Sequence, residues 1–229
     1  MENLQCKNSE EIINSKIFLD QELSVSKLKT LIQKKNPVIL EIGANCGQTT
    51  IEFTEVFPDA KIYCFEPDPR AIAKFKNNIH SGNVQLIEAA VGAESGHVLF
   101  HQSSGAEWID SAGWDHSGSI RKPKTHLEVW PWVKFEKSIP VPMIRLDDWV
   151  LTHGIQSIDF IWADVQGAES DLILGALETL KFTNFFYTEF SDDEWYEGQI
   201  NFNTLSSLLP NFELLHKFQN DALFTRIIA

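Results

Sequence analysis

Four acidic side chains and one glycine-bearing turn are spaced along the chain so that they could form a single reactive site. Glu41 precedes the turn at residues 43–47, and Glu66, Asp164 and Glu189 each lie at or near the end of a short apolar run. Carboxylates in such positions can accept hydrogen bonds from hydroxyl groups, attract a cation, or remove a proton from a reacting group. The glycines of the turn let the backbone bend sharply and let a ligand approach without a Cβ in its way.

The turn at residues 43–47 is poorly suited to a pyrophosphate. The dinucleotide fingerprint G-x-G-x-x-G would need glycine at positions 43, 45 and 48, but Asn45 and Gln48 occupy the last two. Glu41 also places negative charge near the ligand, which favours a cation over a phosphate. Glu66, about 20 residues beyond the turn, is placed to accept both hydroxyls of an adenosine ribose. These features predict S-adenosylmethionine, which carries a sulfonium and an ammonium group and no phosphate.

Three other interpretations of this pattern stay open. Some other α/β protein with a plain strand–turn–helix unit would share the turn. An NAD-dependent oxidoreductase is disfavoured by Asn45 and Gln48. A module that binds S-adenosylmethionine or carbohydrate without catalysis would carry the same residues.

The elements that must position these residues alternate between strands and helices. Short apolar runs predict buried strands, and apolar residues at helical spacing follow them. The expected strands lie near 38–42, 62–66, 84–91, 158–164 and 185–190, and the expected helices near 51–57, 69–79, 146–151 and 172–180. This alternation predicts a doubly wound, mostly parallel α/β sheet, closed by an antiparallel pair at 212–217 and 222–226. Ligands in such sheets bind beyond the carboxyl ends of the strands, where the acidic residues should converge.

Two regions lie outside this alternation. Residues 1–36 carry apolar positions at helical spacing and predict an N-terminal helical cover on a domain formed by residues 37–229. The segment from about 103 to 138 is polar and glycine-bearing, and it is expected to be an insertion or lid that binds the substrate. Its flat indole rings suit a sugar-like acceptor, or they only pack the insertion onto the body. These rings belong to Trp108, Trp114, Trp130 and Trp132.

The overall composition limits the class of protein and its partners. The chain has 229 residues, 43% of them hydrophobic, which is enough for one substantial core. A net charge of −13 without a basic stripe argues against a nucleic acid as partner. No apolar run approaches the roughly 20 residues of a membrane span, and the N-terminus lacks an apolar signal segment. We therefore expect a cytoplasmic protein whose 3 cysteines are reduced; the sequence does not indicate its oligomeric state.

Four short motifs, in this order and spacing, support a resemblance. They are Glu-Ile-Gly-Ala-Asn-Cys-Gly at 41–47, Phe-Glu-Pro-Asp-Pro at 65–69, Ile-Arg-Leu-Asp-Asp at 144–148 and Asp-Val-Gln-Gly-Ala-Glu at 164–169. They resemble the FkbM family of S-adenosylmethionine-dependent methyltransferases over about residues 37–190. That family usually has Asp-Val-Gly-Ala-Asn in the first motif and Asp-Val-Glu-Gly-Ala-Glu in the last, so Glu41 and Gln166 depart from its pattern.

The resemblance implies a seven-stranded class I methyltransferase fold, which is Rossmann-like, and O-methylation of a hydroxyl on a sugar, a glycan or a small natural product. It implies that Gly43, Asn45 and Gly47 contact the methionine part of the cofactor and that Glu66 binds its ribose. The other residues expected in the cofactor site are Glu41, Pro67, Ala90 and Asp164.

Three side chains are candidates for the base that assists methyl transfer to a neutral hydroxyl. Asp164 is the first, because it ends the strand beside the glycine turn, although it could instead bind the cofactor's ammonium group or cap the next helix. Glu189 is the second and His101 the third, since an imidazole titrates near neutral pH. Asp164, Glu189 and Asp148 together could hold magnesium, but no clustered ligand spacing supports a metal and none is expected.

Overall fold

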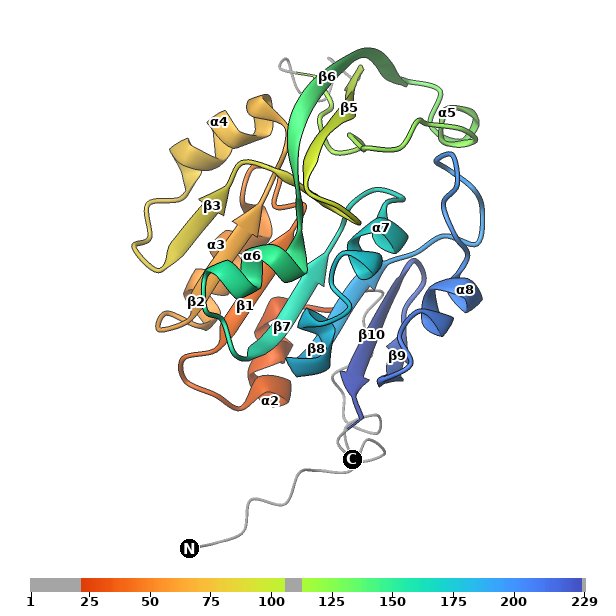
Figure 1. Cartoon of the computed structure of the whole chain (residues 1–229). Coiled ribbons are helices and arrows are strands. Elements are labelled where there is room, and N and C mark those ends of the chain that lie inside the picture. The colour runs from red at the N-terminus through yellow and green to blue at the C-terminus, as the bar shows by residue number, and fades with distance from the viewer. Residues whose placement is uncertain (1–21, 106–112, 228–229) are drawn as a thin grey trace, which may run out of the picture.

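The centre of the molecule is a seven-stranded sheet with the strand order β3-β2-β1-β7-β8-β10-β9 (Figure 1). The computed structural model describes residues 22–105 and 113–227. Strands β3, β2, β1, β7 and β8 pair in parallel, and β10 runs antiparallel to both of its neighbours. The doubly wound, mostly parallel sheet and its closing antiparallel pair are thus confirmed. The strands are β1 Val38–Ile42, β2 Lys61–Phe65, β3 Val84–Ile87, β7 Ile158–Ala163, β8 Thr183–Glu189, β9 Phe212–Lys217 and β10 Asp221–Arg226.

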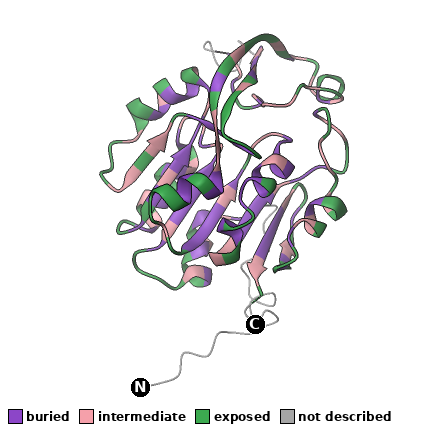
Figure 2. Cartoon of the chain, in the orientation of Figure 1, coloured by how far each residue is buried: buried purple, intermediate pink, exposed green. Residues whose placement is uncertain are grey.

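Helices cover both faces of this sheet, because side chains alternate along each strand and supply an apolar core to each face. Ile39 and Phe160 belong to one core, and Leu40 and Ile161 belong to the other. The first core is covered by η2 Val25–Lys27, α2 Leu28–Ile32, α3 Gln48–Val56 and α4 Pro69–Asn78. The second is covered by α6 Leu146–Thr152, α7 Glu169–Leu174, η3 Thr179–Phe182 and α8 Phe202–Ser207. Figure 2 shows the buried residues concentrated in the sheet between these layers.

A second, three-stranded sheet stands above the main sheet (Figure 1). Strand β6 Val133–Arg145 pairs in parallel with β4 Ala90–Gly92 and antiparallel with β5 Gly96–Gly105. Strands β5 and β6 form a long two-stranded arm, and the chain between them includes the short helix α5 His126–Val129. Both ends of the insertion expected at 103–138 are therefore strand residues of this arm.

The expected single strand at residues 84–91 is wrong, because the run is split between the two sheets. Strand β3 ends at Ile87, opposite the last residue of β2, Phe65. The N–H of Ala89 then donates to the carbonyl of Ile87 at 2.9 Å, which turns the chain. Ala90 begins β4 by pairing with Met143. The break is set by this distant partner, so the local apolar run does not reveal it.

The described part of the N-terminal region packs on the main sheet. Leu23, Val25, Leu28 and Leu31 are buried in the same core as Phe53 of α3. The helical positions expected before residue 22 lie outside the described residues, and the division of the chain at residue 36 stays a prediction. Within the described ranges, no helix combines the length and the apolar character needed to cross a membrane.

Candidate functional site

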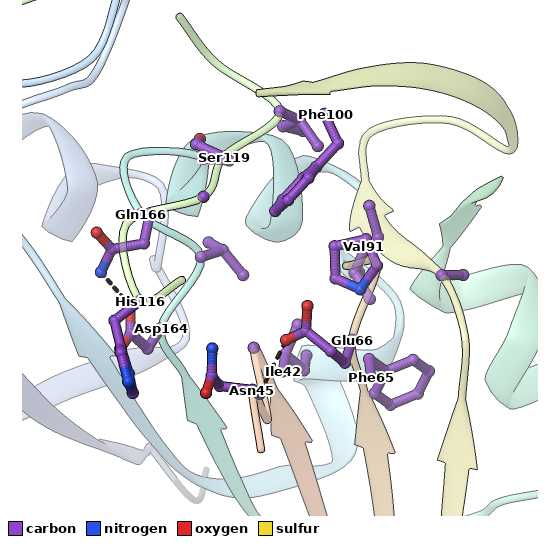
Figure 3. A pocket seen from close by; sticks show the side chains of 18 of the residues that line it. Ile42, Asn45, Phe65, Glu66, Val91, Phe100, His116, Ser119, Asp164 and Gln166 are labelled. Atoms are coloured by element: carbon purple, nitrogen blue, oxygen red, sulfur yellow. Dashed lines mark hydrogen bonds between the residues drawn. The ribbon is translucent and has the colours of Figure 1, made fainter. Parts of the chain in front are cut away.

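A pocket opens at the carboxyl ends of β1, β2 and β7, beneath a roof made of Phe100 of β5 and residues 117–120 (Figure 3). The chain runs from β1 outward to β2 and β3 and then returns to β7 on the other side of β1, so the strand order switches here. Ligands in doubly wound sheets bind at such a switch point. The empty volume, counted out to the open mouth, is about 690 Å³, which suits a small molecule.

The turn after β1 brings its backbone against the end of β7. Gly43 has φ 91°, and a Cβ on it would lie 1.8 Å from the backbone oxygen of Asp164, so no larger residue fits. Asn45 has φ 44°, a left-handed conformation that asparagine tolerates better than most residues, and its side-chain oxygen accepts the N–H of Cys46 at 2.7 Å. Gly43, Asn45 and Asp164, all expected in the cofactor site, thus line one pocket.

Glu66 follows β2 and lines the pocket, with the expected neighbours Pro67 and Ala90. It is 5% exposed, and its two carboxyl oxygens accept the backbone N–H groups of Asn45 and Asp68, both at 2.8 Å. Burial raises the pKa of Glu66 to about 8, and the two backbone hydrogen bonds limit that rise. A carboxylate has about four acceptor positions, so each oxygen can still accept one donor from a ligand.

Glu41 and Gly47, also expected in the cofactor site, do not line the pocket. Alternation along β1 turns Glu41 toward α3, where it is 2% exposed and accepts a hydrogen bond from Thr50 Oγ1 at 2.5 Å. Burial raises the pKa of Glu41 to about 8. Gly47 faces α4, where a Cβ would lie 2.9 Å from the side chain of Ile79. Both residues therefore lie on the side of the turn that faces the helices, away from the pocket.

Asp164, Gln166 and Glu189 form a hydrogen-bonded group at β7 and β8, and the first two face the pocket opposite Glu66 (Figure 3). Gln166 Nε2 donates to Asp164 Oδ1 at 2.7 Å and to Glu189 Oε2 at 3.0 Å. Although Asp164 is exposed to the pocket, loss of hydration raises the pKa of both carboxyl groups. The pKa of Glu189 lies well above its usual value, through loss of hydration and then because Asp164 lies beside it, so Glu189 is the member of the pair that holds a proton.

Tyr196 connects this group to the roof. Its hydroxyl lies 2.8 Å from the backbone oxygen of Ser117 and 3.0 Å from Gln166 Oε1, and the residue is 1% exposed. Its ring packs on Gly167, where a Cβ would lie 2.7 Å from it. The sequence did not predict a role for Tyr196, because this residue lies outside the four motifs. The only signal was the acidic and aromatic composition of the loop around it.

Asp115 and His116 form the side of the pocket between the turn and the roof, and both were missed from the sequence. Asp115 is 5% exposed, its Oδ2 lies 2.8 Å from Lys74 Nζ, and its backbone oxygen accepts Asn45 Nδ2 at 3.1 Å. Its Oδ1 is buried without a hydrogen-bond partner among the described residues, and His116 Nε2 lies 3.6 Å from it. When charged, His116 lowers the pKa of nearby Asp164.

His101 does not line the pocket. It lies on β5, where its Nδ1 is 2.7 Å from Ser138 Oγ of the neighbouring strand, and partial burial lowers its pKa. The arm therefore holds this imidazole outside the pocket, and the structure does not support His101 as the base.

The tryptophans of the expected insertion separate into two places. Trp114 contacts the imidazole of His116 with ring centroids 4.7 Å apart, and it meets Trp132 edge-on at 5.2 Å. Trp130 instead packs against Trp195 at 4.9 Å and against a buried histidine of α5. None of these three expected residues is among those that line the pocket, and Trp108 lies outside the described residues. Trp114 therefore orients a pocket residue, whereas Trp130 packs the segment onto the body.

The carboxylates considered for a metal do not all come together. Asp148 lies on α6, where its Oδ1 is 3.0 Å from Arg145 Nη1. Among the residues that the structure describes, no three side chains of His, Cys, Asp or Glu are grouped so that they could hold a metal ion.

Residues 41–224 match the family model described as the methyltransferase FkbM domain. The chain belongs to the FkbM methyltransferase family. It is 47% identical over 193 residues to the 2-O-methyltransferase NoeI of Sinorhizobium fredii (strain NBRC 101917 / NGR234), and the match covers 84% of this chain and 79% of NoeI.

The fold agrees with this assignment. The crystal structure of the methyltransferase FkbM from Methylobacillus flagellatus superposes with a TM-score of 0.52 at 12% identity, over 83% of this chain. At this identity the likeness supports the fold alone, and the match covers only 44% of that longer chain. The protein is thus a methyltransferase with the class I, Rossmann-like fold that the four motifs imply.

Proposed function

We propose that this enzyme transfers the methyl group of S-adenosylmethionine to a sugar hydroxyl, the 2-hydroxyl of a sugar ring in a glycan or a glycosylated small molecule. The proposal rests mainly on the position of Glu66, whose buried carboxyl group lines the pocket at the switch point of the sheet. Its oxygens each hold one backbone N–H and keep one further acceptor position, which fits the two neighbouring hydroxyls of a ribose.

The rest of the pocket fits the other parts of S-adenosylmethionine. Ala89, Ala90 and Val91 give an apolar surface beside Glu66 that suits the adenine. Gly43 leaves the backbone open where the methionine part must pass, and Asp164 supplies a negative charge for its ammonium group. The bound molecule supplies an electrophilic methyl group on a sulfonium.

Two observations support a sugar as the acceptor: the activity for which NoeI is named and the polar side chains on one side of the pocket. NoeI is named a 2-O-methyltransferase, and a hydroxyl numbered 2 suits a sugar ring. On the side opposite Glu66, Ser119, His116 and Gln166 offer hydrogen-bonding groups to such a ring (Figure 3). The net charge of −13 disfavours a nucleic acid as the carrier of that sugar.

Calorimetric titration with S-adenosylhomocysteine tests the cofactor assignment first. Glu66→Ala should weaken binding roughly ten- to a hundred-fold, since it removes two hydrogen bonds that are each worth about 0.5–1.5 kcal/mol. Glu88→Ala, at an exposed carboxylate that pairs with Lys76 outside this pocket, is the matched control and should bind normally. Equal affinity in both variants, or no binding by the wild type, would show that the cofactor site is misassigned.

The acceptor class is tested separately with a pool of methyl glycosides of the common hexoses, deoxyhexoses and pentoses. Mass spectrometry should detect a gain of one methyl group, and NMR of the product should place it on oxygen 2. A wild type that binds S-adenosylhomocysteine but methylates no glycoside of the pool would contradict the sugar acceptor and leave the cofactor assignment standing.

A further inference from the structure

We propose that His116 is the base that removes the proton from the acceptor hydroxyl, and that Asp115 Oδ1 stabilises the imidazolium that forms. This inference rests on the methyl transfer proposed above. It gives the role of base to a residue that lies outside the four sequence motifs.

His116 occupies the position that such a base needs. Figure 3 shows its imidazole beside Asp164, across the pocket from Glu66 and Phe65. If Glu66 holds the ribose, the methyl group and the acceptor lie toward the Asp164 side. The ring is held by contact with Trp114, with centroids 4.7 Å apart. A base must reach the hydroxyl that it deprotonates, and His116 lines the space where that hydroxyl must lie.

Asp115 gives the imidazole a partner for its charged form. The residue is 5% exposed, and its Oδ1 is buried without a hydrogen-bond partner in the described parts of the chain. An unpaired buried carboxylate oxygen is costly, so its presence 3.6 Å from His116 Nε2 calls for an explanation. A small rotation of the ring would let Nε2–H donate to Oδ1, which leaves Nδ1 to take a proton from the acceptor.

The other candidates are less suited to this step. Asp164 Oδ1 already accepts a hydrogen bond from Gln166 Nε2 at 2.7 Å, and the charge of this carboxylate suits the ammonium group of the cofactor. Glu189 holds a proton and stands behind Gln166, away from the pocket lining. These contacts fit Asp164 as a fixed negative charge, whereas His116 makes no such hydrogen bond to the other described residues.

The proton and the electrons balance in a single displacement. The acceptor O–H bond breaks and its proton moves to Nδ1 of His116, while the oxygen forms a bond to the methyl carbon. The bond between that carbon and sulfur breaks, and its electron pair stays on sulfur as a thioether. The positive charge thereby passes from the sulfonium to the imidazolium beside Asp115, and water takes the proton when the product leaves.

Activity with the pooled glycosides tests the proposal through chemical rescue. His116→Ala should lower kcat roughly 100-fold or more, the usual contribution of a general base, and added imidazole should restore part of the rate. His153→Ala is the matched control, because this imidazole stacks on Trp149 and lies outside the pocket. Asp115→Asn should lower kcat while binding of S-adenosylhomocysteine is unchanged. A His116→Ala enzyme with wild-type kcat would overturn the proposal.

A second measurement needs no acceptor and separates this proposal from the proposed function. Diethyl pyrocarbonate acylates uncharged, accessible imidazole nitrogens, and peptide mass spectrometry locates the product. His116 should react in the free enzyme, whereas His126, which is 3% exposed, should not. If exposed histidines react and His116 does not, it lacks the free nitrogen of a base and the proposal fails. If the wild type methylates no glycoside, the acceptor class has failed, and this reaction still tests whether His116 has the free nitrogen that a base requires.

Discussion

Replacing Glu41 with glutamine should change how the stability of this enzyme depends on pH. Glu41 is 2% exposed on the α3 side of β1, and burial raises its pKa from 4.5 to about 8. Between these two pH values, the carboxyl group is ionised in the unfolded chain and protonated in the folded one. Folding then takes up a proton, so the free energy of unfolding must fall as the pH rises through this window.

The structure gives the size of this effect. A rise in pKa from 4.5 to about 8 corresponds to about 5 kcal/mol of lost stability once the pH is above 8. From pH 5 to pH 8 the loss should be roughly 3–4 kcal/mol, which is a large part of the 5–15 kcal/mol that holds a typical domain folded. The glutamine side chain of the Glu41→Gln variant cannot ionise and can still accept the hydrogen bond of Thr50, so the variant should lack this dependence.

Urea unfolding followed by tryptophan fluorescence at several pH values would measure the difference. Glu66 and Glu169 are also buried acids with raised pKa values, but both remain in the variant, so their contributions largely cancel when the two proteins are subtracted. Glu41→Gln should also bind S-adenosylhomocysteine as the wild type does, because Glu41 does not line the pocket. Stability curves that run parallel from pH 5 to pH 8 would refute the reasoning, since they would mean that folding does not shift the titration of Glu41.

Two further substitutions test the construction of the pocket. Gly43→Ala should abolish binding of S-adenosylhomocysteine in calorimetry, because its Cβ would lie 1.8 Å from the Asp164 carbonyl; retained affinity would mean that this turn can move. Tyr196→Phe should lower the free energy of unfolding by roughly 1–3 kcal/mol, since Ser117 and Gln166 lose a buried donor. Tyr63→Phe is its control in the same urea titration, and equal losses in both variants would contradict the link that we assign to Tyr196.

The expected site residues that the structure brings to the pocket include those that end parallel strands. Glu66 and Asp164 meet at one pocket because the carboxyl ends of parallel strands lie at the same edge of a sheet, whatever the distance between them in the chain. Glu41 precedes that edge by two residues. The alternation of side chains on β1 places it with Ile39 rather than with Ile42, so the same pattern that predicts the strand could have excluded it from the pocket.

The residues that the sequence did not locate depend on contacts between distant segments. His116 and Tyr196 come from loops that are far apart in the chain. Tyr196 reaches Ser117, the neighbour of His116, only because the loop after β8 closes against the segment between β5 and β6. The tryptophans of residues 103–138 look alike in the sequence, yet Trp114 supports His116 and Trp130 packs against Trp195. Nothing in the local spacing of these rings distinguishes the two environments.

The arm formed by β5 and β6 has a consequence for how enzymes of this architecture diverge. The proposed contacts to the ribose and to the methionine part come from the ends of main-sheet strands, whereas the roof over them comes from Phe100 of β5 and from residues 117–120, which connect β5 to β6 of a separate sheet. Substitutions in that roof can change which alcohol is admitted while the position of Glu66 stays fixed by β2. Selection can therefore act on the two halves of the pocket independently, so related chains can inherit the same methyl donor and acquire different acceptors.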